Sequence, residues 1–485
     1  MLEPKAIFDF FSEINKVPRP SKHEEKMMEY LKSVAETHNL DYRADEAGNV
    51  IITCAATPGM EKSPTVVIQA HMDMVCEKDK DLDFDFNTRA IETYIEGDWM
   101  KAHGTTLGAD DGIGVAMALA LVTDKSIKHG PVECLFTKDE ESGMTGAFGL
   151  KAGELKGKYL INLDSEDEGE FFIGCAGGMS TTATFSYSAS PLTSGYTILH
   201  VGVNKLTGGH SGDEINKNRA NAIKILARFL YKSMEKYDVQ LLSIDGGNLH
   251  NAIPRFAEAT IAIPSAHKEQ IRIDLNVFAA EVEEEYHVQE KNMELTLGSS
   301  SDHEYPMAID PIVANNLILC LQGLHNGILE MNQDIPGFVE TSSNLASVKM
   351  KDTDKNGGKI EVLVSQRSSS DSGLDSVSNT VAAVFKLAGA DVVFTDRYPG
   401  WKPNPDTRLL KVSVESYKEL FGKEPVVRAI HAGLECGLFS TKYPQMEMIS
   451  FGPTLREVHS PKERLLIPTV DMTWRLLVDI VEKLG

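Results

Sequence analysis

Short apolar runs alternate with helical periods in the first third of the chain. Residues 65–70 form a β-branched apolar run, as expected for a strand that is buried on both faces. Residues 132–136 and 159–163 form two further runs of this kind, and an Ala-rich helical stretch follows Asp110 between the first run and the second. This alternation of strand and helix predicts an α/β fold with a mostly parallel sheet flanked by helices.

Further helical and strand patterns lie on both sides of these runs. Ile7, Phe8, Phe11 and Ile14 form one face of an amphipathic helix. The other elements predicted for this part of the fold are a helix over 24–37, a strand over 50–54, a helix over 409–420, a strand over 446–449 and a final helix over 470–484.

The pattern changes from about residue 186 onward. Residues 199–203 alternate in the manner of a strand with one exposed face, and residues 214–237 carry a long helical period. Alternating strands suit an antiparallel sheet, so this region is predicted to form a separate α+β unit. Its further predicted elements are strands over 257–263 and 360–364 and a charged helix around 281–285.

The length of the chain also argues for two domains. Single cores stop growing at roughly 250–300 residues, and this chain has 485 residues. Because His459 belongs chemically with acidic residues early in the chain, we expect the C-terminal segment to return to the first domain. The prediction is a discontinuous domain over 1–185 and 395–485 that is interrupted by an inserted domain over 186–394.

Imidazole and acidic side chains stand at the ends of the three apolar runs. His71 follows the first run, Glu140 and Glu141 follow the second, and Asp164 follows the third. In an open α/β sheet, ligands bind at the carboxyl ends of the strands. The sequence therefore brings these four side chains toward one edge of the predicted sheet.

The donor atoms of this set are those of a metal site. Zinc takes nitrogen from histidine and oxygen from carboxylate, and it can leave one coordination position open for water. With Asp110 and His459 added, the inventory suits two zinc ions. It predicts a hydrolase.

Each motif also has a purely structural interpretation. A ligating imidazole usually gives its other N–H to a carboxylate, which suits His71 and Asp73, but a lone His-x-Asp is more often a surface pair at a strand end. Asp110 and Asp111 open the Ala-rich helix, where carboxylates are favoured as caps by the free N–H groups. Both roles are compatible, with Asp111 as the cap and Asp110 on the metal.

The adjacent glutamates allow a division of labour. One of Glu140 and Glu141 would bind the metal, and the other would remove a proton from water. Paired glutamates on a solvated loop are the alternative. After Asp164, residues 165–168 are predicted to form a solvated acidic loop.

Composition narrows the class of partner. The formal charge of −23 at pH 7 repels phosphate backbones and anionic lipid, so we expect neither nucleic acid nor a membrane as a partner. The six cysteines are scattered without a C-x-x-C pair, which favours free thiols in a reducing compartment. With no signal-peptide pattern at the N-terminus, a cytoplasmic protein is expected.

In this order the motifs closely resemble those of the co-catalytic zinc aminopeptidase and aminoacylase superfamily. Within it, the resemblance is closer still to the bacterial aminoacyl-histidine (Xaa-His) dipeptidases, in the carnosinase-like branch, and it covers essentially the whole chain. The motifs that carry it are QAHMDMV (69–75), GTTLGAD (104–110), EESGM (140–144), CAGG (175–178), GGHSG (208–212), HAGLECG (431–437) and HSP (459–461).

The resemblance implies two zinc ions in one subunit and assigns ligands to both. His71 and Asp164 would hold the first ion, Glu141 and His459 the second, and Asp110 would bridge them. Mn²⁺ or Co²⁺ are possible substitutes, because carboxylate and imidazole sites accept them. The long first domain would then be the catalytic domain, and the inserted domain a lid and dimerisation domain.

The resemblance also implies catalytic roles beside the ligands. Asp73 would orient His71, and Glu140 would be the general base on a metal-bridged water. A cis peptide is implied between Asp110 and Asp111. Unlike the broader superfamily, the sequence places Gly rather than Lys after Asp111, in agreement with the aminoacyl-histidine branch.

The resemblance implies that three residues of the inserted domain act on the substrate, and two further residues are candidates for lining its pocket. In the inserted domain, His210 would stabilise the oxyanion in its own or a partner's site, Arg367 would grip the substrate carboxylate, and Asn251 would be a second contact. His431 and Glu435 stand where the superfamily has a Gly-Gly-Thr-Asp loop. For these two, pocket lining and ordinary packing remain open alternatives.

The prediction is a metallo-dipeptidase that hydrolyses unblocked dipeptides, with a preference for carnosine-type Xaa-His substrates. We expect small dipeptides as partners and a homodimer formed through the inserted domain. One alternative is a related zinc amidohydrolase that acts on tripeptides or N-acyl amino acids. Another is a catalytically silent metal-binding protein, which the spare glutamate disfavours because a structural zinc site needs no base.

Overall fold

The computed structural model describes residues 2–192, 194–299 and 307–485, and these form two compact units. The first unit comprises the chain up to Cys175 together with Trp401–Ala429 and Leu434–Gly485. The second unit comprises Ala176–Gly400 and Ile430–Gly433. Among the described residues, no helix is both long enough and apolar enough to cross a membrane.

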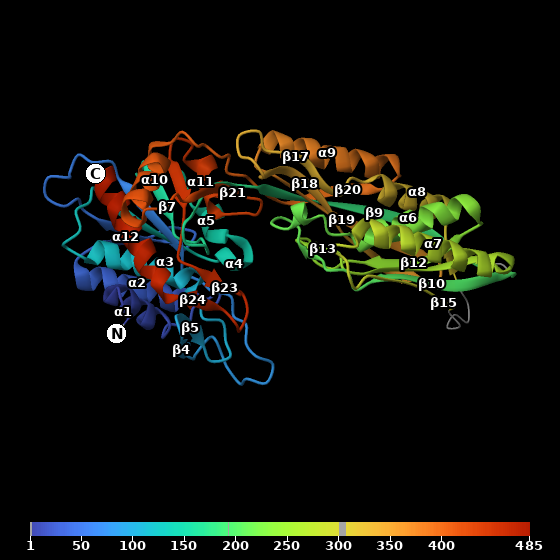
Figure 1. Ribbon diagram of the computed structural model, residues 1–485, viewed down its shortest axis with the longest axis horizontal. Helices are drawn as coiled ribbons and strands as arrows, with labels where there is room; N and C mark the ends of the chain where they lie inside the picture. Colours follow the sequence, from blue (N-terminus) through green and yellow to red (C-terminus); the bar gives the residue numbers. More distant parts are fainter. Residues whose placement is uncertain (1, 193, 300–306) are drawn as a thin grey trace. The chain divides into compact units, whose positions relative to one another are not determined.

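An eight-stranded sheet forms the centre of the first unit (Figure 1). Its central strands β6, β3, β7 and β22 are parallel, and antiparallel strands flank them on both sides. Every residue of β3 and β6 is buried, as expected for strands that are covered on both faces. The order of strands is β1 (Asp41–Ala44), β2 (Val50–Cys54), β6 (Val132–Thr137), β3 (Val66–His71), β7 (Tyr159–Asn162), β22 (Glu447–Ser450), β8 (Glu170–Cys175) and β21 (Val426–Ile430).

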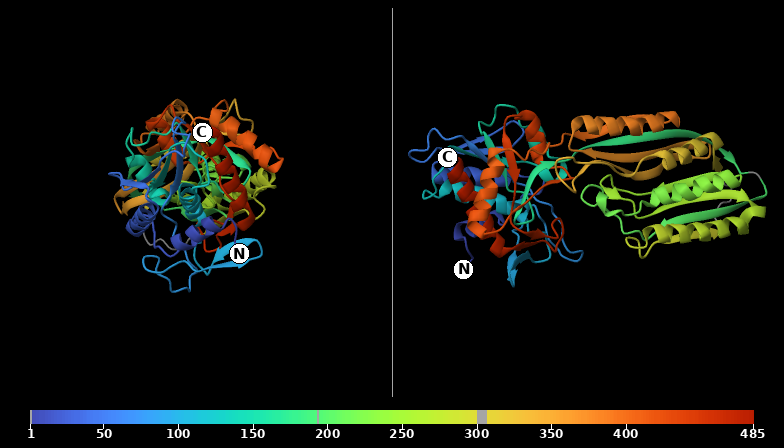
Figure 2. Two further views of the ribbon diagram at one scale, coloured as in Figure 1. Left: turned by 90° about the vertical axis from the view of Figure 1, so that its left-hand side faces the viewer. Right: turned by 45° about the horizontal axis from the view of Figure 1, so that its top comes forward.

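Helices cover this sheet, and a small sheet lies beside it. The Ala-rich α3 is buried along almost its whole length and contacts β3 and α1, whereas α10 and α12 pack side by side (Figure 2). The helices are α1 (Lys5–Ile14), α2 (Glu25–His38), α3 (Ala109–Thr123), α4 (Glu140–Gly143), α5 (Thr145–Gly149), α10 (Arg408–Phe421), α11 (Glu435–Lys442) and α12 (Ile467–Leu484). The small sheet has the order β23 (Leu455–Arg456), β24 (Arg464–Leu466), β5 (Trp99–Ala102), β4 (Thr93–Glu96).

The α/β prediction for this unit is confirmed. The three apolar runs form β6, β3 and β7, and the C-terminal strand β22 pairs in parallel with β7. The prediction of a solvated loop after Asp164 is wrong for Ser165, which is buried and exchanges a hydrogen bond of 2.6 Å with the Ser450 hydroxyl. The reason is that this loop packs against the end of β22.

A mainly antiparallel sheet forms the second unit, with four helices along it. Side chains from both the strands and the helices share one hydrophobic core. The sheet has the order β15 (Glu294–Ser299), β10 (Tyr196–Asn204), β14 (Ala257–Pro264), β12 (Gln240–Gly246), β18 (Val339–Asp354), β19 (Gly357–Ser368), β9 (Gly177–Pro191), β16 (Met307–Ile309), with β17 (Gly327–Met331) on β18 and β20 (Asp391–Tyr398) on β9. The helices are α6 (Ala222–Lys236), α7 (Lys268–Tyr286), α8 (Pro311–Gly323) and α9 (Asp371–Leu387), with the 3₁₀ turns η1 (Ile215–Lys217) and η2 (Ser265–His267).

Two details of this unit differ from the sequence prediction. The single helix predicted over 214–237 is interrupted: η1 comes first, and α6 begins only after Asn221, whose side chain accepts the N–H groups of Ile223 and Lys224. The domain boundaries predicted near 186 and 394 fall inside β9 and β20. Because these two strands pair with each other, both lie wholly within the second unit.

Candidate metal centre

The parallel strands of the first unit bring His71 and Asp164 together. His71 is the last residue of β3 and is 1% exposed, and Asp164 follows the neighbouring strand β7. His71 Nε2 lies 3.5 Å from Asp164 Oδ1 and 3.0 Å from Asp110 Oδ1. These three side chains form the first group of ligand atoms.

A second group forms around His459. His459 Nε2 lies 3.0 Å from Glu141 Oε2, at the start of α4, and 3.1 Å from Asp110 Oδ2, at the start of α3. Asp110 therefore directs one carboxylate oxygen to each group. The two groups share this residue, as the bridging role predicts, and together we call their members the ligand cluster: His71, Asp110, Glu141, Asp164 and His459.

The spacing of the donor atoms is compatible with a bound divalent cation. Ligand atoms around a tetrahedral zinc ion, at roughly 2.0–2.1 Å from it, lie about 3.4 Å from one another. The separations in the ligand cluster are 3.0–3.5 Å. Glu141 Oε1 is moreover buried without a hydrogen-bond partner among the described residues. A cation in each group would bind these donor atoms.

Excess negative charge marks the same cluster. Burial raises the pKa of Asp164 to about 7, and the neighbouring carboxylate of Asp110 contributes to the increase. Burial by itself would lower the pKa of His71, but the carboxylates of Asp164, Asp110 and Asp73 outweigh it and raise that pKa well above 6.5. Divalent cations would relieve this repulsion.

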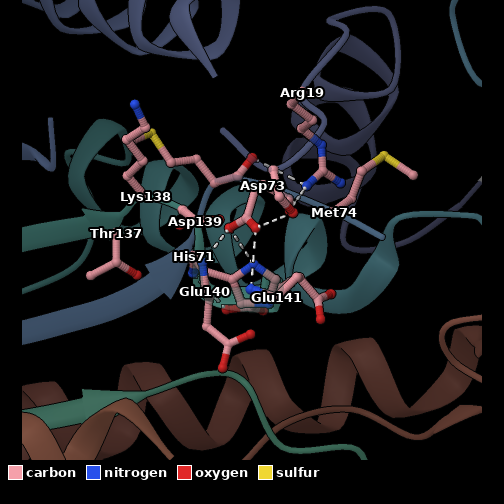
Figure 3. Close-up of polar contacts among 12 residues, drawn as sticks. Arg19, His71, Asp73, Met74, Thr137, Lys138, Asp139, Glu140 and Glu141 are labelled. Carbon is pink, nitrogen blue, oxygen red and sulfur yellow. Dashed lines mark hydrogen bonds and ion pairs between the residues drawn. The ribbon is translucent and has the colours of Figure 1, made fainter. Parts of the chain in front are cut away.

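Asp73 contacts both His71 and the turn that carries Glu140 and Glu141 (Figure 3). Its carboxylate accepts the backbone N–H groups of Glu140 at 3.0 Å and Glu141 at 3.2 Å, and the hydroxyl of Ser21 at 2.7 Å. His71 Nδ1 lies 3.3 Å from the same carboxylate. Asp73 therefore holds an imidazole ligand and the turn that carries both glutamates, whose side chains point away from it.

The turn between β6 and α4 is fixed by further side chains. Asp139 has a left-handed backbone conformation, and its carboxylate accepts the hydroxyls of Ser142 and Thr145. The backbone N–H of Asp139 bonds to Glu24 Oε1 at 3.1 Å. These contacts fix the direction in which Glu140 and Glu141 leave the strand.

Glu140 is the spare carboxylate of the site. One of its oxygens lies within 4.8 Å of ligand atoms of His71 and Glu141. Its pKa is raised well above the ordinary value, first by burial and then by neighbouring carboxylates. A glutamate with a raised pKa beside a ligand cluster is suited to accept and return a proton.

The start of α3 has the predicted cis peptide between Asp110 and Asp111. Asp111 is buried and does not join either ligand group. Its carboxylate accepts the backbone N–H of His71 at 3.3 Å and that of Gly114 at 3.2 Å. Asp111 is thus a cap of the helix that also contacts the backbone of His71.

Of the five residues predicted to act at the substrate, four lie in the second unit and Glu435 lies in the first. The four are His210, Asn251, Arg367 and His431. Arg367, on β19, donates to the Tyr398 hydroxyl at 2.9 Å, and His431 Nε2 lies 2.7 Å from the Ser342 hydroxyl. Burial lowers the pKa of His431 to about 3, and the charge of Arg367 adds to the decrease. His210, on β11 (Gly209–His210), is affected in the same direction by the same two causes. We call His210, Arg367 and His431 the basic cluster.

The two remaining predicted contacts are of different kinds. Asn251 precedes β13 (Ala252–Ile253), and its carbonyl accepts the N–H of Ser211, beside His210. Glu435 belongs to the first unit, where its buried Oε2 accepts the side chains of Gln69 and Thr137, each at 2.7 Å. The prediction that either residue contacts substrate stays a prediction.

Sequence reasoning missed two residues beside the ligand cluster. Arg19 and Glu463 are both buried, and both bond to the backbone around Gly108. No sequence signal separates Glu463 from the other acidic residues except that it follows His459 by four positions.

With this geometry the chain can be compared with known proteins. The sequence model of peptidase family M20/M25/M40 matches residues 67–483. The chain belongs to this peptidase family. The predicted resemblance, the fold class and the assignment as a peptide hydrolase are thereby confirmed.

Two relatives match the M20/M25/M40 member along its whole length. It is 40% identical over 483 residues to the cytosol non-specific dipeptidase of Escherichia coli (strain K12), with 100% of this chain and 98% of the relative covered. It is 41% identical to the aminoacylhistidine dipeptidase of Vibrio alginolyticus, whose crystal structure it matches with a TM-score of 0.91 over 100% of this chain and 97% of that chain. The aminopeptidase PepT of Bacillus cereus ATCC 10987, at 17% identity, a TM-score of 0.61 and coverage of 100% and 99%, shares the fold.

Proposed function

We propose that this M20/M25/M40 member is a metal-dependent dipeptidase with two cations in one subunit. The observation that carries the proposal is the pair of ligand groups that share Asp110, with the spare carboxylate of Glu140 beside them. Support comes from the two full-length relatives, both of which are named as dipeptidases. His71 and Asp164 would hold one cation, and Glu141 and His459 the other.

Bound cations in this cluster would polarise the scissile carbonyl and lower the pKa of water. Glu140 takes the proton from the attacking water and passes it to the leaving amine, as its raised pKa favours. Asp73 holds the His71 ring and fixes the backbone N–H groups from which Glu140 and Glu141 project. These contacts keep the position of Glu140 relative to His71 and Glu141 unchanged during the reaction.

Substrate recognition is assigned to the second unit. We propose that Arg367 binds the carboxylate of a dipeptide, that His210 stabilises the oxyanion and that Asn251 makes a further contact. His431 and Glu435 are proposed as lining residues. The preferred substrate is an unblocked dipeptide with C-terminal histidine, a proposal supported by the name of the Vibrio relative.

The proposal also covers the identity of the metal, the oligomeric state and the cellular location. Zinc is the proposed metal because it takes nitrogen from imidazole and oxygen from carboxylate, and Mn²⁺ or Co²⁺ would substitute. A homodimer is proposed, with the second unit as its interface. A cytoplasmic location is supported by the six free cysteines and by the name of the cytosolic relative from E. coli.

A substrate panel tests this proposal. Metal-free protein would be loaded with Zn²⁺, Mn²⁺ or Co²⁺ and assayed on Ala-His, carnosine, a tripeptide and an N-acetylated amino acid. We expect turnover of the dipeptides, with Ala-His among the best, and little turnover of the other two compounds. Activity on the N-acetylated substrate alone, or on none of them with any metal, would contradict the dipeptidase assignment.

A further inference from the structure

The carboxylate of Glu463 lies beneath the start of α3, against the backbone that leads to Asp110. Glu463 is 2% exposed. Its Oε2 accepts the N–H groups of Leu107 at 2.8 Å and Gly108 at 3.1 Å. Its Oε1 accepts those of Ala109 at 2.8 Å and Asp110 at 3.3 Å. Four consecutive N–H groups, the last of them on the bridging ligand, thus converge on one buried carboxylate.

The guanidinium of Arg19 holds the same segment through its carbonyl groups. Arg19 is 1% exposed and donates from Nη2 to the carbonyl of Gly108. From Nη1 it donates to the carbonyl of Asp73 (Figure 3). A Cβ at Gly108 or at Gly112 would lie 2.6 Å from Nη2, so glycine at both positions allows the guanidinium to approach. Gly108 also has a φ of 67°, which glycine adopts without strain.

Together these two side chains join three of the five segments that supply the ligand cluster. Glu463 follows His459 by four residues, so it ties the segment with one imidazole ligand to the start of α3. Arg19 ties the start of α3 to the backbone of Asp73, two residues after the other imidazole ligand. Asp110 stands between them and faces both groups of ligand atoms.

Burying a guanidinium and a carboxyl group is costly unless hydrogen bonds compensate. Their hydrogen bonds are concentrated on the backbone of the segment 107–110 and of Asp73. A shift of this segment by a fraction of an ångström would move Asp110 away from one of its two imidazole neighbours, which lie at 3.0 and 3.1 Å.

We propose that Glu463 and Arg19 are positioning residues that fix the bridging carboxylate of Asp110 between the two cation positions. This inference rests on the proposed two-metal function. Neither residue belongs to the groups of ligand atoms. They act through the backbone that carries Asp110. Their loss is therefore expected to lower the affinity of the site for metal.

Glu133 provides a matched control in the same unit. It is 4% exposed, and its Oε2 accepts the N–H groups of Lys156 at 2.8 Å and Gly157 at 3.1 Å. It lies near the start of β6, whereas the ligands follow the carboxyl ends of the strands. The change Glu133→Gln therefore alters a buried carboxyl group that accepts two backbone N–H groups, where Glu463 accepts four, and it leaves the segment 107–110 untouched.

The test measures metal affinity rather than turnover. Metal-free wild-type, Glu463→Gln and Glu133→Gln proteins would be titrated with Zn²⁺ against a chromophoric chelator, and with Co²⁺ while the visible absorption of bound cobalt is recorded. Because glutamine offers one acceptor oxygen and turns an NH₂ group toward two of the four N–H groups, we expect a loss of affinity of about 10- to 100-fold in Glu463→Gln. The cobalt spectrum of this variant should also change. In Glu133→Gln, both readouts should stay within about twofold of wild type, although the melting temperature falls.

Arg19→Lys is a second variant, and it decides the question if Glu463→Gln does not fold. A lysine ammonium keeps the charge but lacks the planar fork that reaches the carbonyl groups of Met72, Asp73 and Gly108, so weaker metal binding is again expected. Wild-type affinity in Arg19→Lys and in any folded Glu463→Gln protein would overturn this inference alone. A wild-type chain that binds fewer than two ions would overturn the proposed function and, with it, this inference.

Discussion

The two units place their functional candidates in opposite electrostatic surroundings. In the first unit, the carboxylates of the ligand cluster are numerous enough to raise the pKa of the buried His71 well above its ordinary value. In the second unit, burial and the charge of Arg367 lower the pKa of His210 and that of His431. The first arrangement suits cations. In the second, the lowered pKa values favour neutral imidazoles, and the guanidinium of Arg367 is the group that we propose to bind a substrate carboxylate. The chemistry of bond cleavage and the recognition of substrate are thereby assigned to different parts of the chain.

The largest expected effect concerns the general base in the first unit. Glu140→Gln should lower kcat by about 10²- to 10⁴-fold, because an amide cannot accept the proton of the attacking water. Metal content, measured on the same preparation by elemental analysis, should stay at the wild-type value, since Glu140 is the spare carboxylate. Glu141→Gln serves as the contrasting variant, and there we expect metal to be lost.

Retention of most of the turnover by a Glu140→Gln protein with its full metal content would show that the base lies elsewhere. Loss of metal from this variant would instead place Glu140 among the ligands. Either outcome would remove the distinction between base and ligand on which the mechanism depends.

The next prediction concerns the basic cluster of the second unit. Arg367→Lys should raise KM for dipeptides about 10- to 100-fold with a smaller effect on kcat, because an ammonium cannot form the bidentate contact with a carboxylate. A dipeptide amide, which lacks that carboxylate, is the control substrate. Wild type and variant should hydrolyse the amide with similar kcat/KM, and an equal loss on both substrates would argue against carboxylate recognition.

Metal removal should destabilise the first unit more than the second. Ligands that bind only the folded state stabilise it by about 2.7 kcal/mol when present at 100 times their Kd. Because the ligand cluster lies wholly within the first unit, chelation by EDTA should increase hydrogen exchange in segments such as 66–71 and 107–114. Exchange in β14 and α6 of the second unit should change little. Uniform destabilisation of both units would contradict this difference.

The same contrast explains what could be predicted from the sequence. His71 and Asp164 could be placed because parallel strands end at a common edge, so a residue just after a buried apolar run has a predictable neighbourhood. Glu463 and Arg19 could not, because their partners are backbone groups far away in the chain: 54 positions separate Arg19 from Asp73, and 355 separate Gly108 from Glu463. The break before α6 was hidden for a related reason. The apolar period of 214–237 continues through it, and only the Asn221 side chain marks where the helix begins.

The smallest expected effect tests the assignment of Glu435. Its Oε2 already accepts two buried side chains, Gln69 and Thr137, whereas its Oε1 has no partner among the described residues. In Glu435→Gln the amide oxygen can keep both bonds, and the new NH₂ group takes the unpartnered position at a cost of about 1–3 kcal/mol. If Glu435 only supports β3 and β6 from within, the melting temperature should fall by a few degrees while KM for Ala-His stays within about twofold. A tenfold rise in KM without a change in melting temperature would instead place Glu435 against the substrate, and recognition would then extend into the unit that carries the metal ligands.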